Sequence, residues 1–283
     1  AVAFADSVSA PAPLALRANR LRATRDEVFA RLRAERPDAI LEPSPLAPDA
    51  IIARGLEGLA ATDAWHEGLV SVEDTGAQVI VELCGARAGE RILDACAGSG
   101  GKSAHLAALA DDGARIGAVD LSAPKLSEAR QAFARLGVKS VTTTAADLTR
   151  PFGDGAPFDR VLLDAPCSGL GVLRRHPEAL GRRTHADLAR LAGQQASLLA
   201  TVAPLVAPGG TLTYSVCTFD KVECEDVVAA FLGARPDFRV EAPPPSPRVP
   251  WERLVDAAGF VRTWPHRDDA DAFFAARLVR WRP

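Results

Sequence analysis

The sequence predicts an α/β fold in which a doubly wound, mostly parallel sheet follows a small N-terminal α+β lobe. From Ala88 onward, short apolar runs alternate with amphipathic stretches, which is the pattern of parallel strands connected by helices on both faces. The first seventy residues lack this alternation, because they consist of a proline-rich entry, an arginine-rich segment and a proline-punctuated stretch. We therefore expect a lobe over residues 1–70 and a larger domain over residues 71–283.

The elements of the larger domain are expected from the spacing of its apolar residues. Strands are expected at Arg91–Ala95, Arg115–Asp120, Val141–Ala145, Arg160–Asp164 and Thr211–Ser215, with later candidates at Phe238–Glu241, Phe260–Trp264 and Ala272–Trp281. Helices are expected at Ser103–Ala110, Pro124–Leu136, Thr184–Val206 and Val222–Ala234. Thr184, with Asp187 three residues later, is typical of a capped helix start. Gly209-Gly210 is expected to turn the chain into the fifth strand.

The lobe has fewer signals. A strand is expected at Leu14–Asn19 and a helix at Thr24–Glu35, and the prolines that follow predict loop. The five prolines between Pro243 and Pro250 indicate a surface loop within the larger domain, because strand patterns resume after them.

Composition excludes several classes of protein. A chain of 283 residues with 48% hydrophobic content can bury a full core. No apolar run is long enough for a membrane span and no signal peptide is recognisable, so we expect a cytoplasmic protein without membrane contact. Five cysteines without a CxxC pair predict neither a disulfide framework nor a metal site. The absence of methionine indicates that Ala1 is not the native start and that the chain is part of a longer one.

Charge is distributed unevenly along the chain. A net charge of −3 argues against a protein that coats nucleic acid by bulk charge. Seven arginines nevertheless lie between Leu14 and Arg36, and five between Arg174 and Arg190. Such runs are usually solvated helical faces. Because these two flank the motifs described next, we expect them to contact the phosphates of a nucleic acid.

A glycine-rich loop follows the first strand of the larger domain. The segment RILDACAGSGGKS joins an apolar strand to a helix through a turn at which backbone can approach a ligand closely. A phosphate-binding Walker loop would need glycine where Cys96 stands, and the dinucleotide fingerprint that starts at Gly98 ends on Ser103 instead of glycine. S-adenosylmethionine remains as the candidate ligand. The loop residues expected to bind it are Cys96, Ala97, Gly98, Ser99, Gly100, Gly101 and Lys102.

Acidic residues stand at the ends of the following strands. Asp120 ends the second strand, where a carboxylate can accept both ribose hydroxyls of a nucleoside. Asp147, just past the third strand, is expected to meet the adenine amino group, and Asp164 ends the fourth strand. Each acid alone is more often a turn or cap residue, but the series favours a cofactor site.

Two cysteines follow the fourth and fifth strands, in the segments FDRVLLDAPCSG and TLTYSVCTF. A lone free cysteine is usually a small buried apolar residue. Two at one sheet edge suit the chemistry of cytosine methylation, because carbon 5 of cytosine accepts a methyl group only after a nucleophile adds to carbon 6, and a thiolate can do this. A second group must then help to remove the proton from carbon 5, and a carboxylate, here Asp164, must stabilise the ring as it gains charge.

The segments DACAGSGGKS, DAPCSG and YSVCTF, in this order, resemble the Nop/Sun family of RNA 5-methylcytosine methyltransferases, which act on RNA such as 16S ribosomal RNA. The likeness extends over nearly the whole chain. It implies a Rossmann-like sheet of seven strands, of the S-adenosylmethionine-dependent methyltransferase type. It also implies that Cys217 is the nucleophile, that Cys167 assists product release, and that the loop from Cys96 to Lys102 holds the cofactor with Asp120, Asp147 and Asp164.

DNA cytosine methyltransferases attack with the cysteine of a Pro-Cys motif, which would be Cys167 here, so Cys217 favours RNA. The N-terminal lobe is then expected to bind RNA, most simply ribosomal RNA, with transfer RNA as an alternative. Two further hypotheses stay open: a ribosome assembly factor that binds RNA and cofactor with little turnover, and methyl transfer to a protein or small molecule. A monomer is the default expectation.

Overall fold

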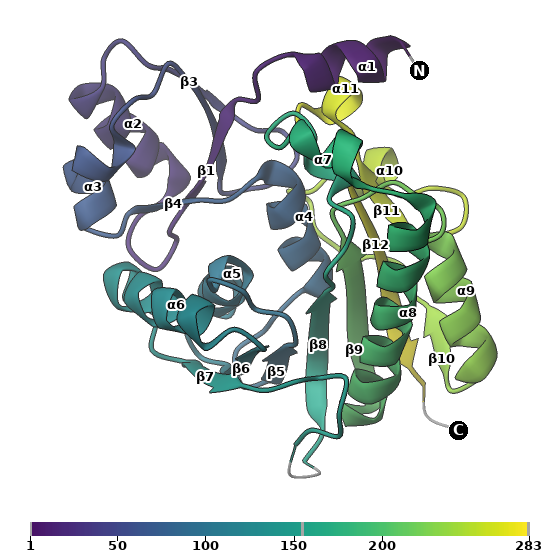
Figure 1. Cartoon of the computed structure of the whole chain (residues 1–283). Helices are drawn as coiled ribbons and strands as arrows, with labels where there is room; N and C mark the ends of the chain where they lie inside the picture. Colours follow the sequence, from purple (N-terminus) through teal and green to yellow (C-terminus); the bar gives the residue numbers. More distant parts are fainter. Residues whose placement is uncertain (1, 154–155, 282–283) are drawn as a thin grey trace.

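The computed structural model describes residues 2–153 and 156–281, which form a small antiparallel sheet beside a large mixed sheet (Figure 1). The small sheet has the order β2-β3-β1-β4, with β1 at Leu14–Ala18, β2 at Ile40–Pro43, β3 at Ala50–Arg54 and β4 at Val70–Val72. Helix α2, Arg25–Glu35, packs on it through Val28 and Leu32. The expected lobe is therefore confirmed as an α+β unit.

The expectation of loop after α2 is wrong, because β2, β3 and β4 lie there. The prolines in this stretch led to the prediction of loop where β2 and β3 lie. Pro43 ends β2, which is an edge strand of the small sheet, and a missing N–H at such a position leaves the sheet's hydrogen bonds intact. Ala50–Arg54 is a short apolar run that is buried at four of its five positions.

The large sheet runs β10-β12-β9-β8-β5-β6-β7, and β11 pairs with β12 beside this path. Its strands are β5 Arg91–Asp94, β6 Arg115–Asp120, β7 Val141–Ala145, β8 Phe158–Asp164, β9 Val206–Val216, β10 Phe238–Val240, β11 Val261–Thr263 and β12 Phe273–Arg280. Pairing from β7 through β9 is parallel, and β12 pairs antiparallel with β9. The mostly parallel, doubly wound sheet is confirmed, with eight strands in place of the expected seven because β11 joins off the main path.

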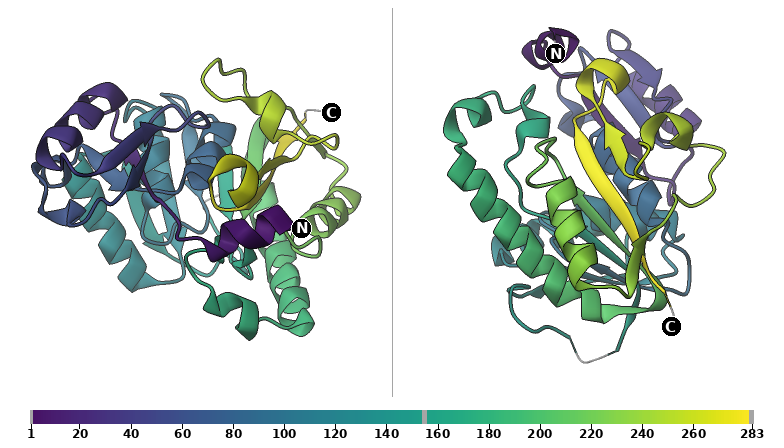
Figure 2. Two further views of the ribbon diagram at one scale, coloured as in Figure 1. Left: turned by 90° about the horizontal axis from the view of Figure 1, so that it is seen from above. Right: turned by 90° about the vertical axis from the view of Figure 1, so that its right-hand side faces the viewer.

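Helices cover both faces of the large sheet (Figures 1 and 2). One layer consists of α4 Thr75–Cys84, α5 Gly101–Leu109 and α6 Ala123–Leu136; the other consists of α8 His185–Val202 and α9 Glu225–Ala234. Shorter helices are α1 Val2–Ser9, α3 Asp63–His66, α7 Glu178–Arg182, α10 Trp251–Leu254 and α11 Pro265–Asp268, with 3₁₀ turns at Leu59–Ala61, Leu170–Val172 and Ala203–Leu205. None of these helices, in the part of the chain that the structure describes, is long and apolar enough to cross a membrane.

Two helix boundaries differ from expectation by more than two residues, and helix α4 was not expected. Helix α8 starts with the predicted Thr184–Asp187 capping box but ends at Val202, because a 3₁₀ turn containing Pro204 follows and β9 begins at Val206. Helix α9 begins at Glu225, so Cys224 is its cap residue and does not lie inside it. Helix α4 was not expected, although Thr75, Gln78 and Glu82 lie at helical spacing along one face; all ten of its residues, this polar face included, are buried.

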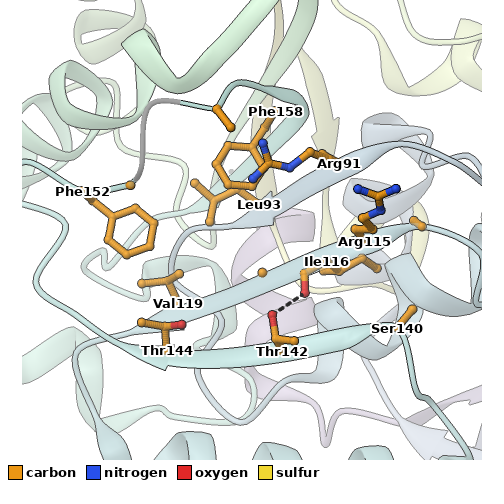
Figure 3. Close-up of a pocket in the computed structure, with 14 residues that line it drawn as sticks. Arg91, Leu93, Arg115, Ile116, Val119, Ser140, Thr142, Thr144, Phe152 and Phe158 are labelled. Atoms are coloured by element: carbon orange, nitrogen blue, oxygen red, sulfur yellow. Dashed lines mark hydrogen bonds between the residues drawn. The ribbon is translucent and has the colours of Figure 1, made fainter.

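The face of β5, β6 and β7 that carries Leu93 and Val119 is hollowed (Figure 3). The described residues between β7 and β8 form no helix over it. The hollow, of about 840 Å³, is bordered by Phe152 and by Phe158, on which the Arg91 guanidinium lies at 4.9 Å from the ring centroid. It includes none of the sequence-predicted site residues, which gather elsewhere.

Candidate functional site

The predicted site residues lie at the carboxyl edge of the large sheet. Because β5, β6, β8 and β9 are parallel, Asp94, Asp120 and Asp164 end their strands on the same side, and Cys217 follows β9 there. Ligands of open α/β sheets bind at this edge.

A cavity of about 310 Å³ opens at this edge. Of the residues expected to bind a cofactor, it is lined by Cys96, Ala97, Gly98, Gly101, Lys102 and Asp164. Its other lining residues are Glu73, Asp74, Ala77 and Asp94, which were not among the candidates. The segment Val72-Glu73-Asp74, which directly precedes the buried helix α4, is the sequence signal that could have indicated Glu73 and Asp74.

Four of the expected cofactor contacts do not line the cavity: Ser99, Gly100, Asp120 and Asp147. Asp120 accepts hydrogen bonds from the backbone N–H groups of Gly98 and Ser122, both at 2.8 Å, so it holds the glycine loop in place. Asp147 accepts from the backbone N–H and hydroxyl of Thr149, which lowers the pKa of its carboxyl.

Gly100 has a structural role in the loop. It caps α5 in the left-handed conformation, with a φ of 81°, and a Cβ there would stand 2.7 Å from side-chain atoms of Ala129 and Phe133. Gly98 is also left-handed, and the space around its Cα is open. The loop therefore presents backbone to the cavity without side chains in the way.

Lys102 and Asp164 both line the cavity and form an ion pair there. The Lys102 Nζ donates to Asp164 Oδ2 at 2.6 Å, while the Ser215 hydroxyl donates to the other carboxylate oxygen at 2.7 Å. Burial by itself lowers the pKa of Lys102, but the charge and hydrogen bond of Asp164 outweigh it and the pKa is raised. Asp164 is thereby held by two donors, one of which, Ser215, the sequence did not single out.

A buried ionic network lies behind this pair and joins the lobe to the sheet. Arg17 of β1 donates through Nε to Glu73 at 2.6 Å, and His105 Nδ1 lies 3.3 Å from the other Glu73 oxygen. All three side chains are almost fully buried. Burial raises the pKa of Glu73, but His105 and then Arg17 outweigh that effect and bring it down to about 2.

Asp94 is an acid with an unusual environment. Burial raises its pKa to about 6, even though the Ser103 hydroxyl donates to Oδ2 at 2.6 Å. Its other oxygen is buried and has no hydrogen-bond partner in the structure. Such a group is a strong signal for a ligand that bears positive charge or hydrogen-bond donors. The cavity, with its acids and open backbone, thus suits the amino and sulfonium groups of S-adenosylmethionine.

The two cysteines of the predicted pair are in contact: the Sγ atoms of Cys167 and Cys217 are 3.2 Å apart. Neighbouring hydrogen bonds fix their loops together, since the Ser168 hydroxyl donates to the Thr218 hydroxyl at 3.0 Å and the Gly171 N–H donates to the Cys217 carbonyl at 2.9 Å. The hydrogen bond with Cys217, followed by burial, raises the pKa of Cys167 well above its usual value. Cys167 is therefore a protonated thiol at neutral pH.

Residues that the sequence did not single out support the loop of Cys167. Glu223 is fully buried and accepts from the Ser168 N–H and from Gln195 Nε2, both at 2.9 Å. Gln195 also donates to the Pro166 carbonyl. No sequence pattern marked these residues, because their contacts join β8, α8 and the turn after β9.

Three arginines expected to contact phosphate are engaged elsewhere, so that expectation is wrong for them. Arg17 is buried against Glu73, as described above. Arg174 and Arg175 both donate to Asp271 at 2.9 Å. The exposed arginines of the same two segments are Arg20, Arg22, Arg31, Arg33, Arg182, Arg183 and Arg190.

The described residues contain no group of three or more His, Cys, Asp and Glu side chains placed to hold a metal ion. The doubly wound sheet, whose carboxyl edge carries a glycine loop, acids and an open cavity, is the Rossmann-like fold of S-adenosylmethionine-dependent methyltransferases. Residues 82–279 match the model of the 16S rRNA methyltransferase RsmB/F family. The chain belongs to this family.

Individual relatives agree with the family. The chain is 36% identical over 276 residues to a "Probable ribosomal RNA small subunit methyltransferase B" of Bacillus subtilis, covering 95% of this chain and 60% of that protein. It is 35% identical to a ribosomal RNA small subunit methyltransferase B of Klebsiella pneumoniae, with the same coverage. The chain thus spans about 60% of the length of these curated relatives.

Solved structures share the fold. A protein named PH0851 superposes with a TM-score of 0.89 at 30% identity, over 98% of this chain and 61% of that one. NSun6 from Pyrococcus horikoshii, solved with SFG, superposes with a TM-score of 0.86 at 19% identity, over 100% of this chain and 94% of that one.

Proposed function

We propose that this chain methylates carbon 5 of a cytosine in ribosomal RNA, through a covalent adduct on Cys217. The observation that carries this proposal is the 3.2 Å contact between the sulfurs of Cys167 and Cys217. Two structural cysteines would not need to meet at the one sheet edge that also presents Asp164 and the cofactor cavity.

Each residue has a distinct role in this reaction. The Cys217 sulfur forms a bond to carbon 6 of the cytosine, and the displaced electron pair makes carbon 5 nucleophilic. S-adenosylmethionine, when bound, supplies the methyl group. Asp164, kept in place by Lys102 and Ser215, stabilises the ring as its nitrogen gains charge and a proton. In the last stage water takes the proton from carbon 5, the electron pair of that bond restores the carbon 5–carbon 6 double bond, and the bond from carbon 6 to Cys217 breaks. The Cys167 thiol assists by donating its proton to the departing Cys217 sulfur, with which it is in contact.

The cofactor would lie against the loop from Cys96 to Lys102, with Asp94 and Asp164 of the cavity beside it. Asp120 would support this loop from behind, where it bonds to Gly98. The RNA would meet the N-terminal lobe and the exposed arginines on either side of the edge, which provide sequence-independent attraction to phosphate. The reaction would take place in the cytoplasm, on a monomer of this chain.

The proposal is tested with labelled S-adenosylmethionine and undermethylated 16S ribosomal RNA. Wild type should transfer label to cytosine, and Cys217→Ala should lower transfer by at least about a thousandfold because the nucleophile is gone. Cys84→Ala, which removes a buried cysteine outside the site, should transfer at the wild-type rate. Normal transfer by Cys217→Ala would show that the nucleophile is misassigned, and RNA binding without transfer by wild type would favour the assembly-factor alternative.

Cofactor affinity should depend on pH through Asp94. Its pKa is raised to about 6, so the carboxyl is neutral at pH 5 and ionised at pH 7.5. A ligand with positive charge binds the ionised form better, and affinity for S-adenosylmethionine should therefore rise as pH increases through 6. Asp94→Asn should remove most of this rise, as measured by isothermal titration calorimetry between pH 5 and 7.5. An equally steep rise in the variant would assign the pH dependence to another group.

A further inference from the structure

Four aromatic side chains gather beside the site without a role in the reaction described above. Phe219, two residues after Cys217, has its ring centroid 5.9 Å from Trp264, and Trp264 lies 5.8 Å from His266. Phe4 of helix α1 caps the group, at 5.1 Å from Phe219 and within about 6 Å of the other two rings. We call Phe219, Trp264 and His266 the aromatic platform.

Helix α1 contacts this platform through Phe4 and packs along α11. None of its eight residues is buried, and it lies along α11 at the end of the molecule toward which β8 and β9 point (Figures 1 and 2). A hollow of about 590 Å³ opens between the two helices, lined by Ala3, Ser7 and His266 among others. The Phe4 ring meets each of the three platform rings edge-on, at interplanar angles of 79° to 85°.

We propose that the aromatic platform stacks an unpaired nucleobase of the RNA next to the target cytosine, in the place that Phe4 occupies here. This rests on the proposed function. Proteins that read single-stranded RNA stack splayed bases on aromatic side chains, and a base taken out of its helix to reach Cys217 leaves its neighbours unstacked. A platform attached to the chain two residues after the nucleophile is positioned for such a neighbour.

The observed packing favours this use over a purely structural one. Rings that serve only the core are fully enclosed, as Phe274 is, whereas Phe219 and Trp264 are only partly buried even with α1 in place, and His266 is exposed. Phe4 contacts these rings only edge-on, from a helix none of whose residues is fully buried. A base offers a larger ring surface that can lie offset-stacked on Phe219 or Trp264, and it would take the place of Phe4.

The test uses an 11-nucleotide single-stranded RNA with a central cytosine and 2-aminopurine at one neighbouring position, whose fluorescence falls on stacking. Wild type should quench the probe. Phe219→Leu and Trp264→Leu should weaken binding by about 5- to 100-fold and lose the quench, because stacking on each ring is removed. Phe219→Tyr, which keeps a ring, should restore both. Trp281→Leu is the matched control. This exposed tryptophan directly follows the end of β12, outside the platform, and the variant should behave as wild type.

The Phe4→Ala variant probes the exchange directly. Its affinity for the probe should be several-fold higher than that of wild type, since nothing competes with the base; unchanged or weaker binding would contradict the exchange. Wild-type affinity and quenching in both leucine variants would overturn the platform itself. Quenching by a wild type that transfers no methyl group would leave the platform standing and refute the proposed function, and methyl transfer to RNA without quenching at either neighbour would do the reverse.

Discussion

Replacing Cys167 with alanine is expected to leave this chain covalently joined to its RNA. In the proposed reaction the Cys217–carbon 6 bond breaks only after carbon 5 has lost its proton, and Cys167 is the side chain in contact with the Cys217 sulfur. Without that thiol, addition and methyl transfer still proceed but release is slow, so the adduct accumulates. Incubation with labelled RNA and S-adenosylmethionine should give a band of higher mass that survives denaturing electrophoresis, and turnover should fall to background.

Three comparisons make this result specific. The double variant Cys167→Ala/Cys217→Ala should form no adduct, since it lacks the nucleophile. Cys224→Ala, at the cap of α9, should turn over normally. A stalled adduct in Cys217→Ala, with none in Cys167→Ala, would mean that the two thiols have exchanged roles.

Replacing Arg17 with glutamine is expected to destabilise the fold by about 3–5 kcal/mol, because it removes the counter-ion of a buried carboxylate. Arg17 and Glu73 are 2.6 Å apart and almost inaccessible to solvent, and the pair joins the lobe to the cavity wall. Urea unfolding followed by circular dichroism measures the change. Arg33→Gln, at an exposed arginine of the same lobe, should alter the free energy of unfolding by less than about 0.5 kcal/mol.

The same pair predicts the acid limb of stability. The pKa of Glu73 is lowered from 4.5 to about 2, so the folded state binds its proton less readily than the unfolded state. Its contribution to stability is complete above pH 4.5 and is lost as pH falls toward 2. Glu73→Gln should flatten the stability curve in that interval. If Arg17→Gln lowered the free energy of unfolding no more than Arg33→Gln does, the buried pair would contribute little to stability.

The sequence predicted the strands of the large sheet well, because each is a short apolar run bounded by turns. It also predicted that Cys167 and Cys217 share an edge, which follows from parallel strands alone. Asp120 ends its strand as expected, and each of its oxygens accepts one backbone N–H group, so it supports the glycine loop, which the sequence did not indicate. Each oxygen can accept a further hydrogen bond, and the ribose contact expected of Asp120 stays a prediction.

What the sequence did not reveal depends on contacts between distant segments. Arg174 and Arg175 look like exposed charges in the chain, but Asp271, almost a hundred residues later, binds both. Asp94 has an ordinary strand-end position, and only its burial shows that its pKa is raised. Helix α4 does carry a polar face, formed by Thr75, Gln78 and Glu82, but its enclosure between the two sheets depends on contacts with distant segments that its own sequence does not show.

The complete burial of α4 has a mechanical consequence. Gln78 of this helix donates to the Leu16 carbonyl of the small sheet at 3.1 Å, while Gly76 lies against Phe273 of the large sheet closely enough that a Cβ would stand 2.8 Å from the ring. Helix α4 therefore packs against both sheets and couples them. We expect the lobe and the larger domain to melt in a single transition, and a chain cut at residue 70 to yield two fragments that fold only in each other's presence.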